Sequence, residues 1–150
     1  MNAGAFAEGL HLGSLGATVG LVVLDPTAYL RRAPDWSGWV AGHQRLDRVM
    51  SRLAPPLFLT TAAGAALAAA VAATERRPRR AAARALTAAL VGASIAVTLR
   101  GNEPVNVQIR DWRPTDPPAS GWSDTRDRWE RAHRGRRALL ALAATVSVAA

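Results

Sequence analysis

The sequence predicts an all-α, integral membrane four-helix bundle, and two features of the chain lead to this prediction. Long apolar runs with almost no charge alternate with short arginine-rich segments, so the mean hydropathy of +0.03 averages two unlike populations. The apolar runs also lack the polar face that recurs every 3.6 residues in helices of soluble bundles. We expect the 150 residues to form one domain, a single four-helix transmembrane domain over 1–150.

Four apolar runs are expected to form the helices. They cover residues 3–24, which end at Asp25-Pro26, and then residues 53–73, 85–99 and 138–150. About 20 helical residues span a hydrocarbon core of about 30 Å, so the first three runs have roughly the length of a span. The fourth is short, and it can span only if the arginines before it reach back to the interface.

The first run has a competing interpretation as a signal peptide, which would carry positive charge ahead of its apolar stretch. No arginine precedes the run, so we expect a retained helix. Its glycines, Gly9, Gly13, Gly16 and Gly20, follow at spacings of four, three and four and share one helix face. Such a stripe of small residues allows another helix backbone to approach closely.

Three polar connections separate the runs, at 31–52, 74–84 and 100–137. In the last, three prolines and Gly121 predict a loop, and Ser123-Asp124 is expected to cap the helix that follows. Pro55-Pro56 predict a bend where the second run begins. Four spans would place the N-terminus, the 74–84 turn and the C-terminus at one end of the bundle.

The charge and composition exclude several classes of function. The chain has no cysteine, which rules out disulfides and cysteine-based metal sites, and its net charge of +8 comes from arginine without any lysine. Because the arginines flank the apolar runs, we expect them to face a lipid bilayer rather than nucleic acid. The expected location is the cell membrane as a multi-pass protein, with assembly into a homo-oligomer left open.

One polar cluster lies just past the third run, where the sequence reads Asn102-Glu103-Pro104-Val105-Asn106. Two carboxamides and a carboxylate at a membrane exit have no hydrophobic role, and each carboxamide can donate and accept hydrogen bonds. The alternative is a helix C-cap followed by a turn, where asparagine and proline are common.

A second cluster consists of Trp129, His133 and Arg137, which are spaced i, i+4 and i+8 and are expected to share a helix face. Histidine can take up a proton near neutral pH, and arginine can hold the anion that results. The alternative is an interfacial belt, because tryptophan and arginine favour that depth in a membrane.

Two further pairs of ionisable residues are candidates. Glu8 and His11 lie three apart inside the first apolar run, where ionisable groups are costly and therefore often functional, unless they reach water at the helix end. His43 and Asp47 lie four apart and could form an oriented pair, although exposed pairs of this type are common. Three histidines and Glu103 could in principle ligate a metal ion, but no metal-ligand spacing such as HxxxH supports such a site.

At these residues the chain resembles the anthrone oxygenase-like family of small four-helix membrane proteins. The resemblance rests on the glycines of the first helix from Gly13 to Gly20, on the Asn102–Asn106 segment and on the face formed by Trp129, His133 and Arg137. It extends over the whole layout of the chain. Glu103 departs from the pattern, which has an apolar residue after the first asparagine.

The resemblance implies a membrane-embedded oxygenase that oxidises an anthrone-like, polyketide-derived aromatic substrate with O₂ and without a cofactor or metal. It implies that His133 removes a proton while Arg137, Asn102 and Asn106 hold the resulting anion. The implied substrate-binding residues are Trp129, Glu103, Trp112 and His11, and Trp122 could also stack on the ring.

Two alternatives from other classes stand beside this reading. One is a non-catalytic scaffold or subunit of a larger membrane complex, in which the glycine stripe would face a partner. The other is a metal-dependent membrane oxidase. An enzyme is favoured if Glu8, His11 and the two polar clusters line one cavity, whereas a scaffold is favoured if they point outward at different depths.

Overall fold

The structure, a computed structural model, describes residues 3–23, 25–33 and 35–149. Over these residues it is all-α and contains no strand. The elements in chain order are α1 (Ala3–Val23), α2 (Ala28–Arg32), α3 (Trp36–Thr74), α4 (Pro78–Val97), the π-helical turn η1 (Thr98–Asn102), α5 (Glu103–Arg110) and α6 (Trp122–Val148). Leu24 and Ala150, the expected ends of two apolar runs, lie outside the described residues.

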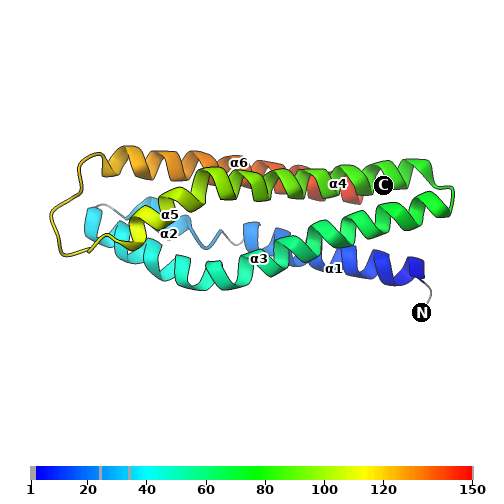
Figure 1. The fold of residues 1–150 in the computed structure, drawn as a ribbon, viewed down its shortest axis with the longest axis horizontal. Helices are drawn as coiled ribbons and strands as arrows, with labels where there is room; N and C mark the ends of the chain where they lie inside the picture. Colours follow the sequence, from blue (N-terminus) through cyan, green and yellow to red (C-terminus); the bar gives the residue numbers. More distant parts are fainter. Residues whose placement is uncertain (1–2, 24, 34, 150) are drawn as a thin grey trace.

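The long helices lie side by side along one axis (Figure 1). Helix α4 packs between α3 and α6, and α1 packs against α3 and α6. The start of α1, the α3–α4 turn and the end of α6 lie at one end of the molecule, while α2 and the loop before α6 lie at the other (Figure 1). This is the arrangement of ends that the order of the apolar runs predicts.

Helix α3 differs from the expectation. The predicted connection at 31–52 is mostly helical, because α3 begins at Trp36 and runs for 39 residues through the second apolar run. The Asp35 side chain caps its start by accepting a hydrogen bond from the Gly38 N–H at 2.8 Å. Pro55 and Pro56 lie inside the helix, which curves along its length (Figure 1). The predicted bend is therefore present, but the predicted helix start is wrong, because the polar segment before it is itself amphipathic.

The exit of the third apolar run also differs from the expectation. The helical path continues past Leu99 through η1 into α5, which ends at Arg110. Asn102 is therefore the last residue of a π-helical turn and not a helix C-cap. Single π-turns inside helices are uncommon and occur frequently at functional sites.

The start of α6 differs from the prediction in its capping residue. The loop at 111–121 is present as predicted, and α6 begins directly after Gly121, whose φ of +71° suits glycine. Ser123 and Asp124 lie inside the first turn of α6 and do not cap it. The arginine-rich segment and the fourth apolar run form one continuous helix, because no proline or glycine pair interrupts residues 122–148.

The basic turn is shorter than expected. Only residues 75–77 connect the two helices, and Arg84 lies inside α4. Its side chain is 3% exposed and forms an ion pair with Glu8 of α1 at 2.5 Å. Arg84 therefore belongs to the interior of the molecule and not to the polar turn.

Within the described residues, the glycine stripe of α1 does not meet another helix. A Cβ atom built on Gly9, Gly13, Gly16 or Gly20 would have no atom of another element within 4 Å. The close approach of α1 and α3 occurs instead at Gly64, where a Cβ atom would lie 3.3 Å from the His11 backbone. The prediction of a close helix contact is thus correct, but the glycine that permits it lies on the partner helix.

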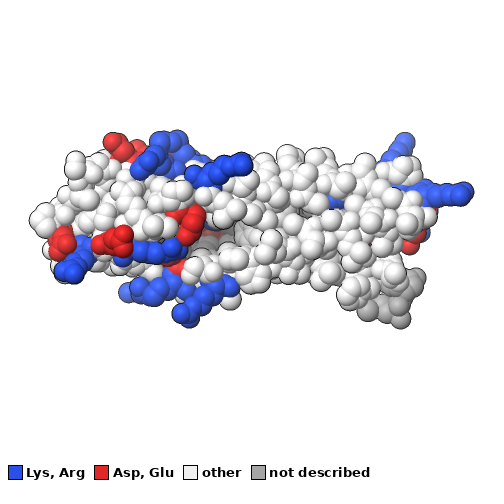
Figure 2. Space-filling view, viewed as in Figure 1, with Lys and Arg blue, Asp and Glu red and all other residues white. Residues whose placement is uncertain are grey.

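Two helical segments in the described part of the chain are long and apolar enough to cross a membrane by length and composition. They are Trp36–Thr74 and Pro78–Arg110, with mean hydropathies of 1.8 and 1.7 over their most apolar windows. Only 33% and 22% of these windows are buried within the molecule, whereas a core helix of a soluble protein is mostly buried. Figure 2 shows charged side chains gathered toward the two ends, with a long uncharged stretch between them.

Candidate functional site

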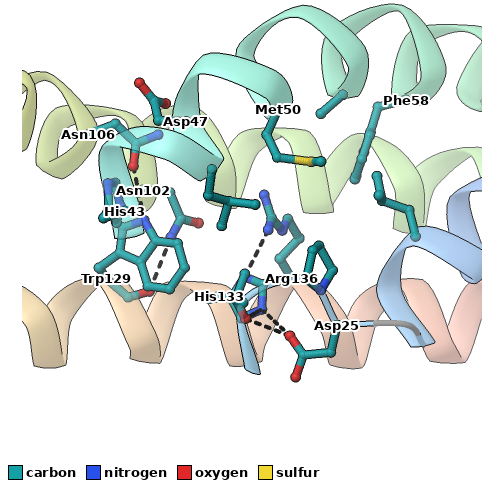
Figure 3. A pocket seen from close by; sticks show the side chains of 15 residues that line it. Asp25, His43, Asp47, Met50, Phe58, Asn102, Asn106, Trp129, His133 and Arg136 are labelled. Atoms are coloured by element: carbon teal, nitrogen blue, oxygen red, sulfur yellow. Dashed lines mark hydrogen bonds and ion pairs between the residues drawn. The ribbon is translucent and has the colours of Figure 1, made fainter. Parts of the chain in front are cut away.

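A pocket of about 80 Å³ lies where the end of α1, the middle of α3, the η1–α5 junction and the first half of α6 meet (Figure 3). Its apolar wall includes Leu46, Met50 and Phe58 of α3. Its polar lining comes from four segments that lie far apart in the sequence. The polar residues are Asp25, Thr27, His43, Asp47, Asn102, Asn106, His133 and Arg136.

The η1 turn forms one side of this pocket. At Gly101 a Cβ atom would lie 2.7 Å from Ala132 Cβ, so only glycine lets η1 approach α6 this closely. The neighbouring Asn102 is 2% exposed, and its Nδ2 donates to the Trp129 carbonyl oxygen at 3.1 Å. One turn later, Asn106 Oδ1 accepts from Trp129 Nε1 at 2.9 Å. Both asparagines of the segment therefore position Trp129.

The ring of His133 stacks on the ring of Trp129, with centroids 5.0 Å apart and planes 4° from parallel. Its Nδ1 is 2.8 Å from a guanidinium nitrogen of Arg136, which can only donate a hydrogen bond. Nδ1 therefore accepts, and the imidazole proton sits on Nε2, which donates to Thr27 Oγ1 at 3.1 Å. Both ring nitrogens of neutral His133 thus have protein partners.

Asp25 is the anionic centre beside His133. Its carboxylate accepts hydrogen bonds from Thr27 Oγ1 at 2.5 Å, Arg31 at 2.6 Å and Arg137 at 2.8 Å. Burial alone would raise the pKa of Asp25, but the bonds from Arg31 and Thr27 and the charge of Arg137 hold it well below its usual range. Asp25 is therefore ionised and anchors the chain between α1 and α2 to α6.

The environment of His133 predicts a pH-dependent stability. Burial, and then the charge of Arg136, lower the pKa of His133 to about 4. An unfolded histidine titrates near pH 6.5, so between these values the unfolded chain binds a proton that the folded chain does not. The free energy of unfolding in detergent is therefore expected to fall as pH is lowered from about 6.5 to 4, with His133 contributing up to about 3 kcal/mol. The His133→Gln variant should show a shallower slope; an equal slope would assign the effect to other groups.

Several buried polar atoms of this pocket have no partner in the described part of the chain. They are Nδ1 and Nε2 of His43, Oδ1 of Asn102 and Nε of Arg136. Buried polar atoms in folded proteins are nearly always hydrogen-bonded, and exceptions commonly mark a site that binds something else. The four atoms offer a hydrogen-bond acceptor, a cationic donor and an imidazole to one small volume.

Comparison of the sequence with known families assigns the chain to one of them. The sequence profile described as anthrone oxygenase matches residues 46–146. The chain belongs to the anthrone oxygenase family. No curated protein and no solved structure matches the chain.

The part of the chain that matches the anthrone oxygenase family contains most of the site. It includes η1, α5 and nearly all of α6, and thus both asparagines, Trp129, His133 and Arg136. Asp25 and His43 precede it. The pocket is therefore built mostly from family-matched helices, and it is completed by residues that precede the match, namely Leu21, Asp25, Pro26, Thr27 and His43.

The structure brings four of the predicted site residues together in the pocket: Asn102, Asn106, Trp129 and His133. Arg137 does not line it, because its guanidinium is bound to Asp25. Glu103 also points elsewhere; it accepts from Asn106 Nδ2 at 3.0 Å and pairs with Arg110 at 3.0 Å.

The other two predicted site residues lie outside the pocket as well. Trp112 packs on Trp36 at a ring distance of 4.7 Å, in an aromatic cluster near the loop that precedes α6. His11 lies near the start of α1, where Nε2 is 3.0 Å from Ser147 Oγ. The sequence could not exclude either residue from the site. A residue's type does not show how far along the bundle its helix contacts the others.

Sequence reasoning gave no role in the site to Asp25 and Arg136 and only a weak one to His43 with Asp47. A signal for Arg136 was present. At 3.6 residues per turn, a residue seven positions on lies within about 20° of the starting face, whereas one eight positions on lies about 80° away. Arg136 is therefore closer than Arg137 to the face of Trp129. Asp25 carried the weaker signal of a lone carboxylate directly after an apolar run.

The three histidines do not meet at one point. His43 and His133 line the same pocket and pack on Trp129 at interplanar angles of 74° and 4°, while His11 lies at another level of the molecule. Within the described residues, no group of three His, Cys, Asp or Glu side chains is arranged to hold a metal ion. The metal-dependent alternative therefore gains no ligand set from this geometry.

Proposed function

We propose that this protein is a membrane-embedded oxygenase that oxidises an anthrone-like aromatic substrate with O₂ and without a bound cofactor. Membership of the anthrone oxygenase family supports the class of reaction. The observation that carries the assignment to this pocket is the convergence of unpartnered buried atoms from His43, Asn102 and Arg136. A ligand with aromatic faces and oxygen substituents would satisfy them.

The proposal includes a multi-pass location in the cell membrane. Two helical segments have the length and hydropathy of spans, and their apolar windows are mostly exposed. Large apolar side chains such as Leu59, Leu67 and Leu86 are 61%, 41% and 49% exposed, and contact with lipid would cover them. Helices α1 and α6 pack against these segments, and we propose that they cross the bilayer with them.

The lining suits a phenolic ketone. The bond from Asn102 Nδ2 to the Trp129 carbonyl oxygen fixes the orientation of the amide. Asn102 Oδ1 is left able to accept a hydrogen bond from a hydroxyl group of the ligand. Arg136 Nε can donate to an oxygen that becomes negative, because it has no partner among the described residues while the neighbouring Nη2 is fixed by His133. A tricyclic ligand exceeds the volume of the closed pocket, so Met50 and Phe58, which line it, would have to move or the ligand would extend outward.

The proposed chemistry needs no redox group of the protein. A pocket imidazole removes a proton from the carbon opposite the ketone, and the electron pair moves onto the ketone oxygen facing Arg136. The anion gives one electron to O₂, and the two radicals combine to form a carbon–oxygen bond. Protonation of the peroxide, loss of the second hydrogen from that carbon and cleavage of the O–O bond release water and leave the quinone. One O₂ is consumed for each quinone formed.

The direct test measures O₂ uptake and quinone formation by the purified protein in detergent with an anthrone. We expect uptake above the uncatalysed rate with equal amounts of O₂ consumed and quinone produced. The matched control is Arg134→Met, because Arg134 lies on α6 but its side chain is 65% exposed. Uptake no faster than in detergent alone would remove the oxygenase assignment for this substrate class.

One observation favours a second candidate function, a non-catalytic membrane subunit. In the described part of the chain, the glycine stripe of α1 has no neighbouring helix, so its surface is open to a helix of a partner or a second copy. Under this alternative the wild-type protein would show no O₂ uptake and would co-purify from membranes in a defined complex.

A further inference from the structure

His43 has an unusual environment for a buried histidine. It lies on α3, is 2% exposed, and neither ring nitrogen has a hydrogen-bond partner among the described residues. Trp39 and Trp129 pack on it at ring distances of 5.3 and 5.0 Å. Aromatic contacts therefore hold its ring in place where it lines the pocket (Figure 3).

His133, the other imidazole of the pocket, is poorly arranged to accept a proton. Its only lone pair on nitrogen accepts from Arg136, and its N–H donates to Thr27. Protonation at Nδ1 would break the bond to Arg136 and place a second positive charge 2.8 Å from the guanidinium. This geometry suits a residue that positions Arg136 and Trp129.

Both imidazoles of the pocket have a carboxylate nearby. His133 Nε2 lies 3.7 Å from Asp25 Oδ1, but three other donors already bind that carboxylate. Asp47 lies one helical turn further along α3 and lines the same pocket, so a positive charge on His43 has a carboxylate nearby. Arg110 of α5 binds that carboxylate at 2.7 and 3.2 Å and offsets part of this attraction. From α6, the guanidinium of Arg126 faces Trp39 at 6.0 Å and not the His43 ring.

From these contacts we infer that His43 is the base that takes the substrate's proton, a role that rests on the proposed function. A free ring nitrogen of His43 forms a bond to the proton as the substrate C–H bond breaks. The electron pair stays on the substrate, where Arg136 holds the oxyanion. His43 later returns the proton to the peroxide oxygen. His43 lies before the segment that matches the family, so the match does not assign this role.

The test separates proton removal from the reaction with O₂. Under anaerobic conditions in D₂O, the wild-type protein should catalyse exchange of deuterium into the anthrone methylene group, followed by NMR. The His43→Gln variant, which cannot take a proton, should lower this rate about 100-fold or more. The His133→Gln variant should retain exchange within about 10-fold. Arg48→Gln, an exposed substitution on α3, is the matched control.

Binding shows whether the variants keep an intact pocket. A hydroxyanthraquinone should quench tryptophan fluorescence with nearly the same affinity in His43→Gln as in wild type. If His43→Gln does not fold, the wild-type protein labelled with ¹⁵N-histidine serves instead: the ligand should shift the His43 ring nitrogens, and unchanged signals would overturn the role.

Each outcome decides between the two proposals. Wild-type exchange in His43→Gln with intact binding overturns the base role, and O₂ uptake by the same sample leaves the oxygenase function standing. Exchange that is lost in His43→Gln, in a protein that consumes no O₂, supports the base and removes the oxygenase function. If the wild type neither exchanges nor consumes O₂, both are overturned.

Discussion

Replacing Arg136 with methionine is expected to lower kcat for anthrone oxidation by about 100- to 1000-fold, the cost of removing a preorganised donor from a developing oxyanion. The guanidinium donates to His133 Nδ1 at 2.8 Å, while its Nε is buried and unpartnered beside the pocket. Methionine keeps an unbranched apolar stem but removes every donor. Steady-state O₂ uptake with a saturating anthrone measures the effect.

The control for this prediction lies on the same helix. Arg134→Met removes the same charge at an exposed position and is expected to leave kcat unchanged within about two-fold. The contrast between the two variants isolates the position of the guanidinium from the net charge of α6. Equal losses in both variants would show that the arginines act through the membrane surface.

Replacing Glu8 with glutamine is expected to destabilise the protein by about 3 kcal/mol, because it leaves the charge of Arg84 buried without its carboxylate. The Arg84 side chain is 3% exposed, and Ser147 supplies only a carbonyl oxygen at 2.9 Å as a remaining partner. Reversible unfolding in mixed micelles measures the loss. Anthrone oxidation by the folded fraction should be retained, because Glu8 does not line the pocket proposed as the active site.

Two further variants check the cause of this loss. The double variant Glu8→Gln/Arg84→Met removes both charges and should recover most of the stability. Glu75→Gln breaks an exposed contact to Arg77 at 3.4 Å and should change the unfolding free energy by less than about 1 kcal/mol. A double variant no more stable than Glu8→Gln alone would contradict the ion-pair explanation.

The arrangement of the elements could largely be predicted from local chemistry. Uncharged runs of span length predict helices wherever they occur, and the prolines and Gly121 predict the break before α6. The limits of α3 could not be predicted in this way, because prolines such as Pro55 and Pro56 usually end a helix. They lie inside this one because tertiary packing on both sides of them outweighs the local cost.

The site was predictable only in part. The sequence placed Trp129 and His133 on one face and marked Asn102 and Asn106, and these four residues do line one pocket. The sequence alone could not show whether Arg136 or Arg137 lines the pocket, because both flank that face. They differ in the side chain that each one binds. Asp25 binds Arg137 and leaves Arg136 to His133, and this depends on how the end of α1 meets α6.

By itself the sequence determined the helical class, the alternation of apolar and charged segments, and the spacing that puts polar side chains on common faces. These properties depend on the periodicity of the helix and on the hydropathy of neighbouring residues. The tertiary structure decided which histidine keeps free nitrogens, which arginine faces the pocket, and that Glu8 and His11 belong to a separate network. Those outcomes depend on contacts between distant segments, whose relative height and rotation are set by packing.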